Sequence, residues 1–209
     1  MSHTSRLVAC VLFALVGCRP PNGPASDAPP LTDDAYPWEL RPAAALGVNV
    51  QWQQSLVAHM GGRRQGFDVV LVKQGDALTL VGLTPFGTKA FVLKEVGTAV
   101  SFESYVDRKL PFPPRFMLID VQRTWFPVAP RSEVDGAVTT VVGGERVVEQ
   151  WGGGRLVRRT FERLDAMPPG RIVIDYAEWD DSGMPRRATV DNAWFGYRMI
   201  VRTTSVTPL

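Results

Sequence analysis

The chain has 209 residues, of which 45% are hydrophobic and 21% are charged. It is therefore apolar enough to fold as one domain with a tail, and disorder throughout is excluded. Its formal net charge of +2 excludes a strongly basic nucleic-acid-binding surface, so we expect no nucleic-acid partner. Two Cys and two His are too few for a zinc site built from these residues, and we expect neither metal nor cofactor.

The first 17 residues are typical of an export signal. Arg6 precedes an apolar run at residues 7–16, which is too short to span a bilayer. The run ends in the sequence LVGC at residues 15–18, which resembles the lipobox of bacterial lipoproteins. The resemblance implies that residues 1–17 are removed and that Cys18 is acylated, for example with palmitate. Position 19 is Arg rather than Asp, which favours the outer membrane, with the protein facing the periplasm.

A proline-rich segment follows the lipobox. Seven of the 24 residues from 19 to 42 are proline, so this stretch cannot form a helix or a central strand. We predict that residues 18–42 are an extended tether and that residues 43–209 form the folded domain. Trp38 and Leu40 are expected to begin docking on that domain.

From residue 48 onward, apolar and polar residues alternate, which predicts strands. Short turns rich in Gly separate them, and such turns favour antiparallel neighbours. One helix is expected at residues 115–125, preceded by a proline-rich entry and ended by Pro127. The predicted strands span residues 48–60, 67–73, 77–83, 89–95, 100–106, 137–142, 145–151, 155–164, 171–179, 186–191 and 197–206.

A sheet of this size has more apolar surface than one helix can cover. We therefore predict a mainly β fold, an open, strongly curled antiparallel sheet or incomplete barrel of about eleven strands, with one to three short helices as a lid. The interior either fills with side chains or holds an apolar ligand, and composition alone leaves both alternatives open.

Three motifs resemble the LolA/LolB-like group, and in particular the outer-membrane lipoprotein receptors of the LolB type. The first is a turn at residues 83–88 (LTPFGT), and the second is the proline-rich entry at residues 110–114 with a helix ending in WFP at 125–127. The third is MPPG at residues 167–170, followed by a strand, a hairpin and a final strand. Their order and spacing agree over roughly residues 47–206.

The resemblance implies an apolar cavity that takes acyl chains, and transfer of lipids or lipoproteins from a periplasmic carrier into the outer membrane. It also implies a membrane-inserting apolar residue in the turn between the third and fourth strands, where Phe86 stands. The alternative is that the Phe86 ring packs inward. Candidate cavity-wall residues are Trp52, Val69, Leu71, Leu80, Phe91 and Phe102, and candidate lid residues are Phe116, Ile119 and Trp125.

Two other functions stay open from the sequence. The protein could be a structural or interaction lipoprotein that scaffolds a cell-envelope complex without a ligand. An enzyme would need a carboxylate pair such as Asp175 and Glu103 brought together; we see no Ser-His-Asp or Cys-His arrangement and expect no enzyme. We expect a monomer. Arg155, Arg158, Arg159 and Arg163 form a basic stripe in the sequence, which is expected to be a solvated face or to meet anionic headgroups or an acidic partner.

Overall fold

The computed structural model describes residues 36, 38–107, 113–130, 134–165 and 170–209. The predictions for the export signal, for Cys18 and for most of the tether lie outside the described residues.

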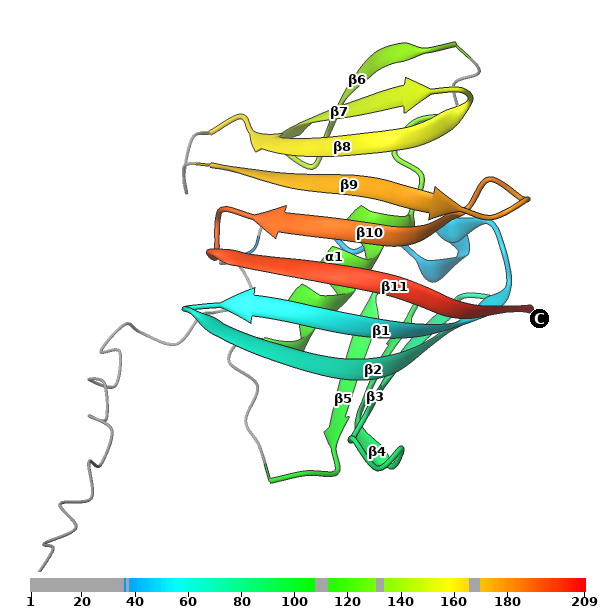
Figure 1. The fold of residues 1–209 in the computed structure, drawn as a ribbon, viewed down its shortest axis with the longest axis vertical. Helices are drawn as coiled ribbons and strands as arrows, with labels where there is room; N and C mark the ends of the chain where they lie inside the picture. Colours follow the sequence, from blue (N-terminus) through cyan, green and yellow to red (C-terminus); the bar gives the residue numbers. More distant parts are fainter. Residues whose placement is uncertain (1–35, 37, 108–112, 131–133, 166–169) are drawn as a thin grey trace, which may run out of the picture. The chain divides into compact units, whose positions relative to one another are not determined.

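Within these described residues, eleven strands form one antiparallel sheet (Figure 1). Their order across the sheet is β5-β4-β3-β2-β1-β11-β10-β9-β8-β7-β6, so the sheet is open, with β5 and β6 at its two edges. The fold class expected from the sequence is confirmed. The strands are β1 (Val50–Met60), β2 (Arg63–Gln74), β3 (Ala77–Leu83), β4 (Lys89–Val96), β5 (Ala99–Ser104), β6 (Gly136–Val142), β7 (Glu145–Gly152), β8 (Arg155–Arg163), β9 (Arg171–Trp179), β10 (Pro185–Asn192) and β11 (Tyr197–Pro208).

Glycine pairs set the tightest hairpins. Gly61 and Gly62 join β1 to β2 with φ of 55° and 73°, and Gly143 and Gly144 join β6 to β7 with φ of 57° and 77°. Both positions of a two-residue hairpin loop of this kind require positive φ, which only Gly adopts without cost. These turns fix the register of the strands on either side.

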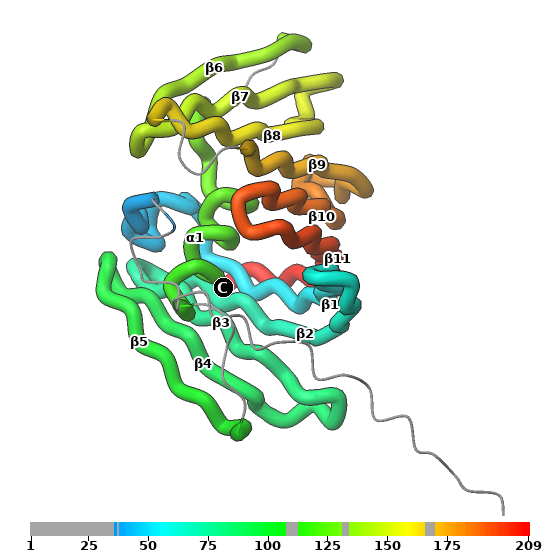
Figure 2. Tube along the Cα trace, turned by 90° about the vertical axis from the view of Figure 1, so that its left-hand side faces the viewer, coloured from blue at the N-terminus to red at the C-terminus, as the bar shows by residue number. Residues whose placement is uncertain are grey.

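In the part of the chain that the structure describes, a single helix, α1 (Pro114–Trp125), crosses the concave face of the curled sheet (Figure 1; Figure 2). Pro114 occupies the first helical turn, where its missing N–H costs nothing. Phe116, Leu118 and Ile119 are fully or almost fully buried. Besides α1, the described residues contain one 3-10 turn, η2 (Ala43–Leu46).

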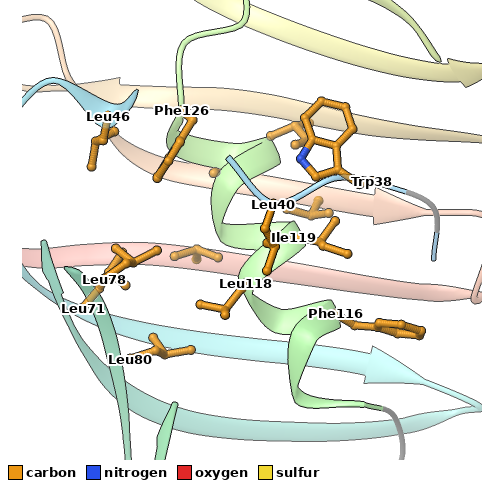
Figure 3. Close-up of a cluster of buried hydrophobic side chains, with 14 of the residues drawn as sticks. Trp38, Leu40, Leu46, Leu71, Leu78, Leu80, Phe116, Leu118, Ile119 and Phe126 are labelled. Carbon is orange, nitrogen blue, oxygen red and sulfur yellow. The ribbon is translucent and has the colours of Figure 1, made fainter. Parts of the chain in front are cut away.

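Residues 36 and 38–47, which we call the N-terminal strap, pack on the side of α1 that faces away from the sheet (Figure 2; Figure 3). Tyr36, Trp38 and Leu40 are buried in the same core as Phe116 and Ile119. The predicted docking of Trp38 and Leu40 on the domain is therefore observed.

Candidate functional site

The concave face has two halves of different chemistry, and α1 lies over both. In the first, which we call the apolar half and which comprises β1–β5, Trp52, Leu71, Leu80 and Leu93 stand opposite one another on successive strands. Opposed residues of an antiparallel sheet share a face, and all four side chains are buried. This row forms the closed floor of the apolar half.

The outer part of the apolar half is less completely covered. Phe102 on β5 stands opposite Leu93 and is 37% exposed. Its ring centroid lies 6.0 Å from that of Phe91, which is half-buried on β4. Phe91 in turn lies over Gly82, where an added Cβ would stand only 2.1–2.6 Å from three atoms of the Phe91 ring. Gly82 thus makes room for an aromatic surface that α1 leaves partly open.

The predicted wall and lid residues fall into three environments. Trp52, Val69, Leu71 and Leu80 lie in the closed floor, whereas Phe91 and Phe102 lie in its open outer part. Phe116 and Ile119 are buried in α1, and the Trp125 ring centroid lies 5.5 Å from that of Trp52. The structure thus places all nine on the sheet's apolar half or on α1, and their role in ligand binding stays a prediction.

Phe86 lies at the tip of the turn between β3 and β4 and is 92% exposed, the highest value among the large hydrophobic side chains of the described residues. Thr84 N donates to Thr88 O at 2.8 Å, and the hydroxyls of these two residues lie 2.8 Å apart. The hydrogen-bonded turn holds the Phe86 ring in solvent, so the alternative of inward packing is not observed. Contact with a membrane stays a prediction.

The second half of the concave face, which we call the ionic half and which comprises β7–β9, carries buried charges. Arg123 of α1 has 0% exposed side chain and donates to Glu145 Oε1 on β7 at 2.7 Å. Its guanidinium carbon lies 4.3–5.3 Å from the ring centroids of four aromatic residues, a distance at which cation–π attraction is effective. These rings belong to Tyr36, Trp38, Phe161 and Trp194.

A second buried ion pair lies beside the first. Arg159 on β8 contacts Glu149 Oε1 on β7 at 2.6 Å through Nη2, and Arg159 Nη1 donates to the backbone oxygen of Arg123 at 2.5 Å. Its neighbour Arg158 points to the opposite face and pairs with exposed Asp175 at 2.6 Å. The expected basic stripe is therefore split by strand alternation, because consecutive residues of a strand face opposite sides.

A closed ring of hydrogen bonds joins the strap, α1 and the last two strands. Asp120 accepts from Tyr36 Oη at 2.5 Å and also from Tyr197 Oη, and Asn192 Nδ2 donates to both phenol oxygens, at 3.0 and 2.9 Å. Burial raises the pKa of Asp120 above its ordinary value, although the hydrogen bonds from Tyr197 and Tyr36 oppose the rise. The ring fixes the middle of α1 against β10 and β11.

Gln122 makes a third fixed point, this time toward the apolar half. Its Oε1 accepts from Arg41 N at 2.9 Å and its Nε2 donates to Arg41 O at 2.8 Å, so its amide pairs with the backbone of the strap. The same Nε2 lies 3.0 and 3.1 Å from the two carboxylate oxygens of buried Glu95. Burial raises the pKa of Glu95 to about 7, opposed by the Gln122 hydrogen bond, while Asp76 adds to the rise and Arg115 opposes it.

The two halves suit different tasks. The charges of the ionic half are paired with one another or packed on rings, so this half holds α1 in place. The two carboxylates considered for catalysis are not brought together. Asp175 on β9 forms an ion pair with Arg158, and Glu103 lies on β5, which is seven strands away from β9 in the sheet order. Within the described residues, no helix is long and apolar enough to cross a membrane, and no cluster of three potential metal-ligating side chains occurs.

The fold resembles that of solved LolA-like proteins. Similar structures include a LolA superfamily protein from Nitrosomonas europaea (TM-score 0.48, 8% identity, covering 81% of this chain and 94% of that chain). Also similar is a candidate outer membrane lipoprotein-sorting protein domain from Vibrio parahaemolyticus (TM-score 0.46, 9% identity, covering 77% of this chain and 85% of that chain). A third similar structure is that of a DUF1329 family protein from Desulfovibrio piger (TM-score 0.41, 10% identity, covering 79% of this chain and 90% of that chain). The predicted resemblance to the LolA/LolB-like group is confirmed as a likeness of fold.

The sequence comparison is more specific about membership. The chain belongs to DUF3261, a family described as a protein of unknown function, whose model matches residues 51–205. That match covers all eleven strands except a few terminal residues of β1 and β11. No curated protein matches the sequence.

Proposed function

We propose that this protein is a non-catalytic lipoprotein of the cell envelope that binds acyl chains against its apolar half and passes lipids or lipoproteins to the outer membrane. In this proposal Cys18 carries the acyl anchor, a periplasmic carrier delivers the cargo and Phe86 touches the bilayer. The observation that carries the proposal is the pairing of partly open aromatic residues, Phe91 and Phe102, with the exposed tip on the same run of strands, β3–β5.

The energetics of the two contacts differ. Full burial of a Phe side chain contributes about 2 kcal/mol, so Phe86 alone would give only a brief contact with a membrane. An acylated Cys18 would already hold the protein at the surface, and a second, weak contact then acts at high effective concentration. A weak tip suits a protein that must release its cargo.

Acyl binding is tested by native purification followed by lipid mass spectrometry, and by titration with a dansyl-labelled fatty acid. We expect bound acyl species, and about a tenfold or greater loss of affinity in a Phe102→Glu variant, because tenfold corresponds to 1.4 kcal/mol and the ring supplies apolar contact. Val141→Glu is the matched control: this exposed residue lies on the opposite edge strand, β6, and should leave affinity unchanged. A lipid-free protein that binds no fatty acid would contradict the proposal.

The role of Phe86 is tested separately by transfer of a fluorescent phospholipid from the protein to phosphatidylethanolamine–phosphatidylglycerol vesicles. A Phe86→Glu variant should keep its circular dichroism spectrum and its fatty-acid affinity and should lose transfer. Val134→Glu, at another exposed hydrophobic position, is the control and should transfer normally. Normal transfer by the Phe86→Glu variant would remove the membrane tip from the proposal.

A ligand-free scaffold in a cell-envelope complex is the second candidate. It is favoured by the polar contacts that tie α1 to β4 through Gln122, to β11 through Asp120 and to β7 through Arg123, because a helix fixed at three points is a poor moving lid. Lipid mass spectrometry separates the two candidates, since a scaffold would carry no stoichiometric acyl species.

A further inference from the structure

The edge strand β6 has the features of a strand that pairs with another strand. It is hydrogen-bonded to β7 on one side, and in the sheet order of the described residues no strand follows it on the other. Its sequence, GAVTTVV, contains no charge and no proline, and its register with β7 runs without a bulge from Gly136 to Val142. Charges, prolines and bulges are the usual means by which sheet edges avoid pairing, and β6 has none of them.

Exposed apolar side chains gather at the same edge. After Phe86, the two most exposed large hydrophobic residues that the structure describes are Val134, at 75%, and Val141, at 64%. Val134 lies two residues before the start of β6, with Asp135 between them, and Val141 is the next-to-last residue of β6. The opposite edge strand, β5, differs because it carries the charged Glu103.

We propose that β6 is a homodimer interface, in which the β6 strands of two copies of this chain pair antiparallel across a two-fold axis at Thr139. A second copy is the occupant that the chemistry fits, because an uncharged strand meets itself without like-charge repulsion. This register pairs all seven residues: Val141 lies opposite Ala137 of the second copy, and Val138 lies opposite Thr140 of the second copy. β-branched residues fill most of these positions, and such cross-strand pairs are favourable.

The pairing joins two open sheets through their β6 edges and leaves β5 and the Phe86 tip of each copy free. It therefore does not depend on the proposed acyl binding, and it replaces the monomer expected from the sequence. A seven-residue edge is small beside the roughly 1,200 Å² of a stable protein–protein interface. We expect a weak, concentration-dependent dimer that forms more readily where copies share one surface.

The first test is sedimentation equilibrium of the protein in detergent over a wide range of concentrations. We expect a reversible monomer–dimer equilibrium, weakened about tenfold or more by Thr139→Lys with Val141→Lys, since lysines would then face one another across the axis. Both positions are exposed, so the circular dichroism spectrum should not change. The matched control is Val100→Lys with Ser101→Lys on edge strand β5, which should leave the dimer intact.

The second test fixes the register by disulfide cross-linking. Directly opposed residues of antiparallel strands have Cα atoms about 4.5–5.5 Å apart, within the range that a disulfide spans. A Thr139→Cys variant should therefore form a covalent dimer, whereas a Val134→Cys variant, opposite Gly144 of the second copy, should not. A monomer at every concentration, a dimer insensitive to the β6 lysines, or equal cross-linking of the two cysteine variants would each overturn the proposal.

Discussion

The two halves of the concave face bury the same helix in opposite ways. In the apolar half, the buried side chains of Leu71, Leu80 and Leu93 line one side of the interior. In the ionic half, Glu145 forms a buried ion pair with Arg123 of the helix. Apolar contacts are non-directional and tolerate a guest of similar chemistry. Paired charges tolerate no such exchange, because each depends on a partner at a fixed position. The contrast explains how one sheet can fix a helix and still offer an open apolar surface.

The largest effect is expected from breaking the ionic half. Arg123→Met should lower the free energy of unfolding by about 3–5 kcal/mol, because it leaves Glu145 buried without its partner. Urea denaturation measures the change. Arg146→Met is the control: its ion pair with Glu162 is 53% exposed on the arginine side, with the charged atoms 3.6 Å apart, and its loss should cost less than about 1 kcal/mol.

A double variant sharpens the same point. Arg123→Met combined with Glu145→Leu should recover much of the stability, because no uncompensated charge stays buried. A double variant as unstable as the single one would show that the aromatic rings around Arg123 matter more than its charge.

A smaller effect, a gain of stability at high pH, is expected from replacing Glu95, the one buried carboxylate among the described residues of β1–β5. Burial raises the pKa of Glu95 from its ordinary 4.5 to about 7. Between pH 4.5 and pH 7, Glu95 is therefore protonated in the folded state and ionised in the unfolded state. The contribution of Glu95 is therefore fully present below pH 4.5 and is lost as the pH rises through about 7, a change of about 3 kcal/mol. A Glu95→Gln variant keeps an acceptor for Gln122 and should be the more stable protein at pH 8.

The measurement is urea denaturation of both proteins from pH 4 to pH 9. The difference between their unfolding free energies should grow from pH 4.5 to pH 7 and then level off. A difference that does not vary with pH would mean that Glu95 ionises as freely in the folded protein as in the unfolded chain.

The smallest effect is expected at Gly82. Gly82→Ala should cost about 1 kcal/mol, because the added Cβ stands 2.1–2.6 Å from atoms of the Phe91 ring and the ring must turn away. The change should also alter the affinity for the dansyl-labelled fatty acid if Phe91 contacts the ligand. A thermal melt and the fatty-acid titration give the two readings, and an unchanged melt would contradict the observed packing.

The strands were predictable because alternation is a local signal. The predicted ranges 77–83 and 171–179 coincide with β3 and β9, and the remaining ranges differ from the observed strands by four residues or fewer at either end. The order of strands is not a local property, so the sequence did not reveal that β5 is an edge strand. Phe102, predicted on a cavity wall, is 37% exposed because it lies on this edge strand.

The interior charges were the main feature missed. The helical pattern places Arg123 on the same face as Phe116 and Ile119, and this was the one available signal that it is buried. The buried polar contacts join distant segments of the chain. Glu145, the partner of Arg123, lies 22 residues after it, and Tyr36, the partner of Asp120, lies 84 residues before it. Periodicity indicates which way a residue points and carries no information about what it meets.

The pairing of Gln122 with the backbone of Arg41 also has a mechanical consequence. Tension applied to the chain ahead of Tyr36 is transmitted along the strap to these two hydrogen bonds and to the aromatic rings around Arg123. Because Tyr36 donates to Asp120 of α1 and accepts from Asn192 of β10, the first elements to feel such a load are α1 and β10, ahead of the edge strands. In a protein held to a bilayer by its N-terminal end, movement of the membrane surface would thus reach the centre of the fold before its periphery.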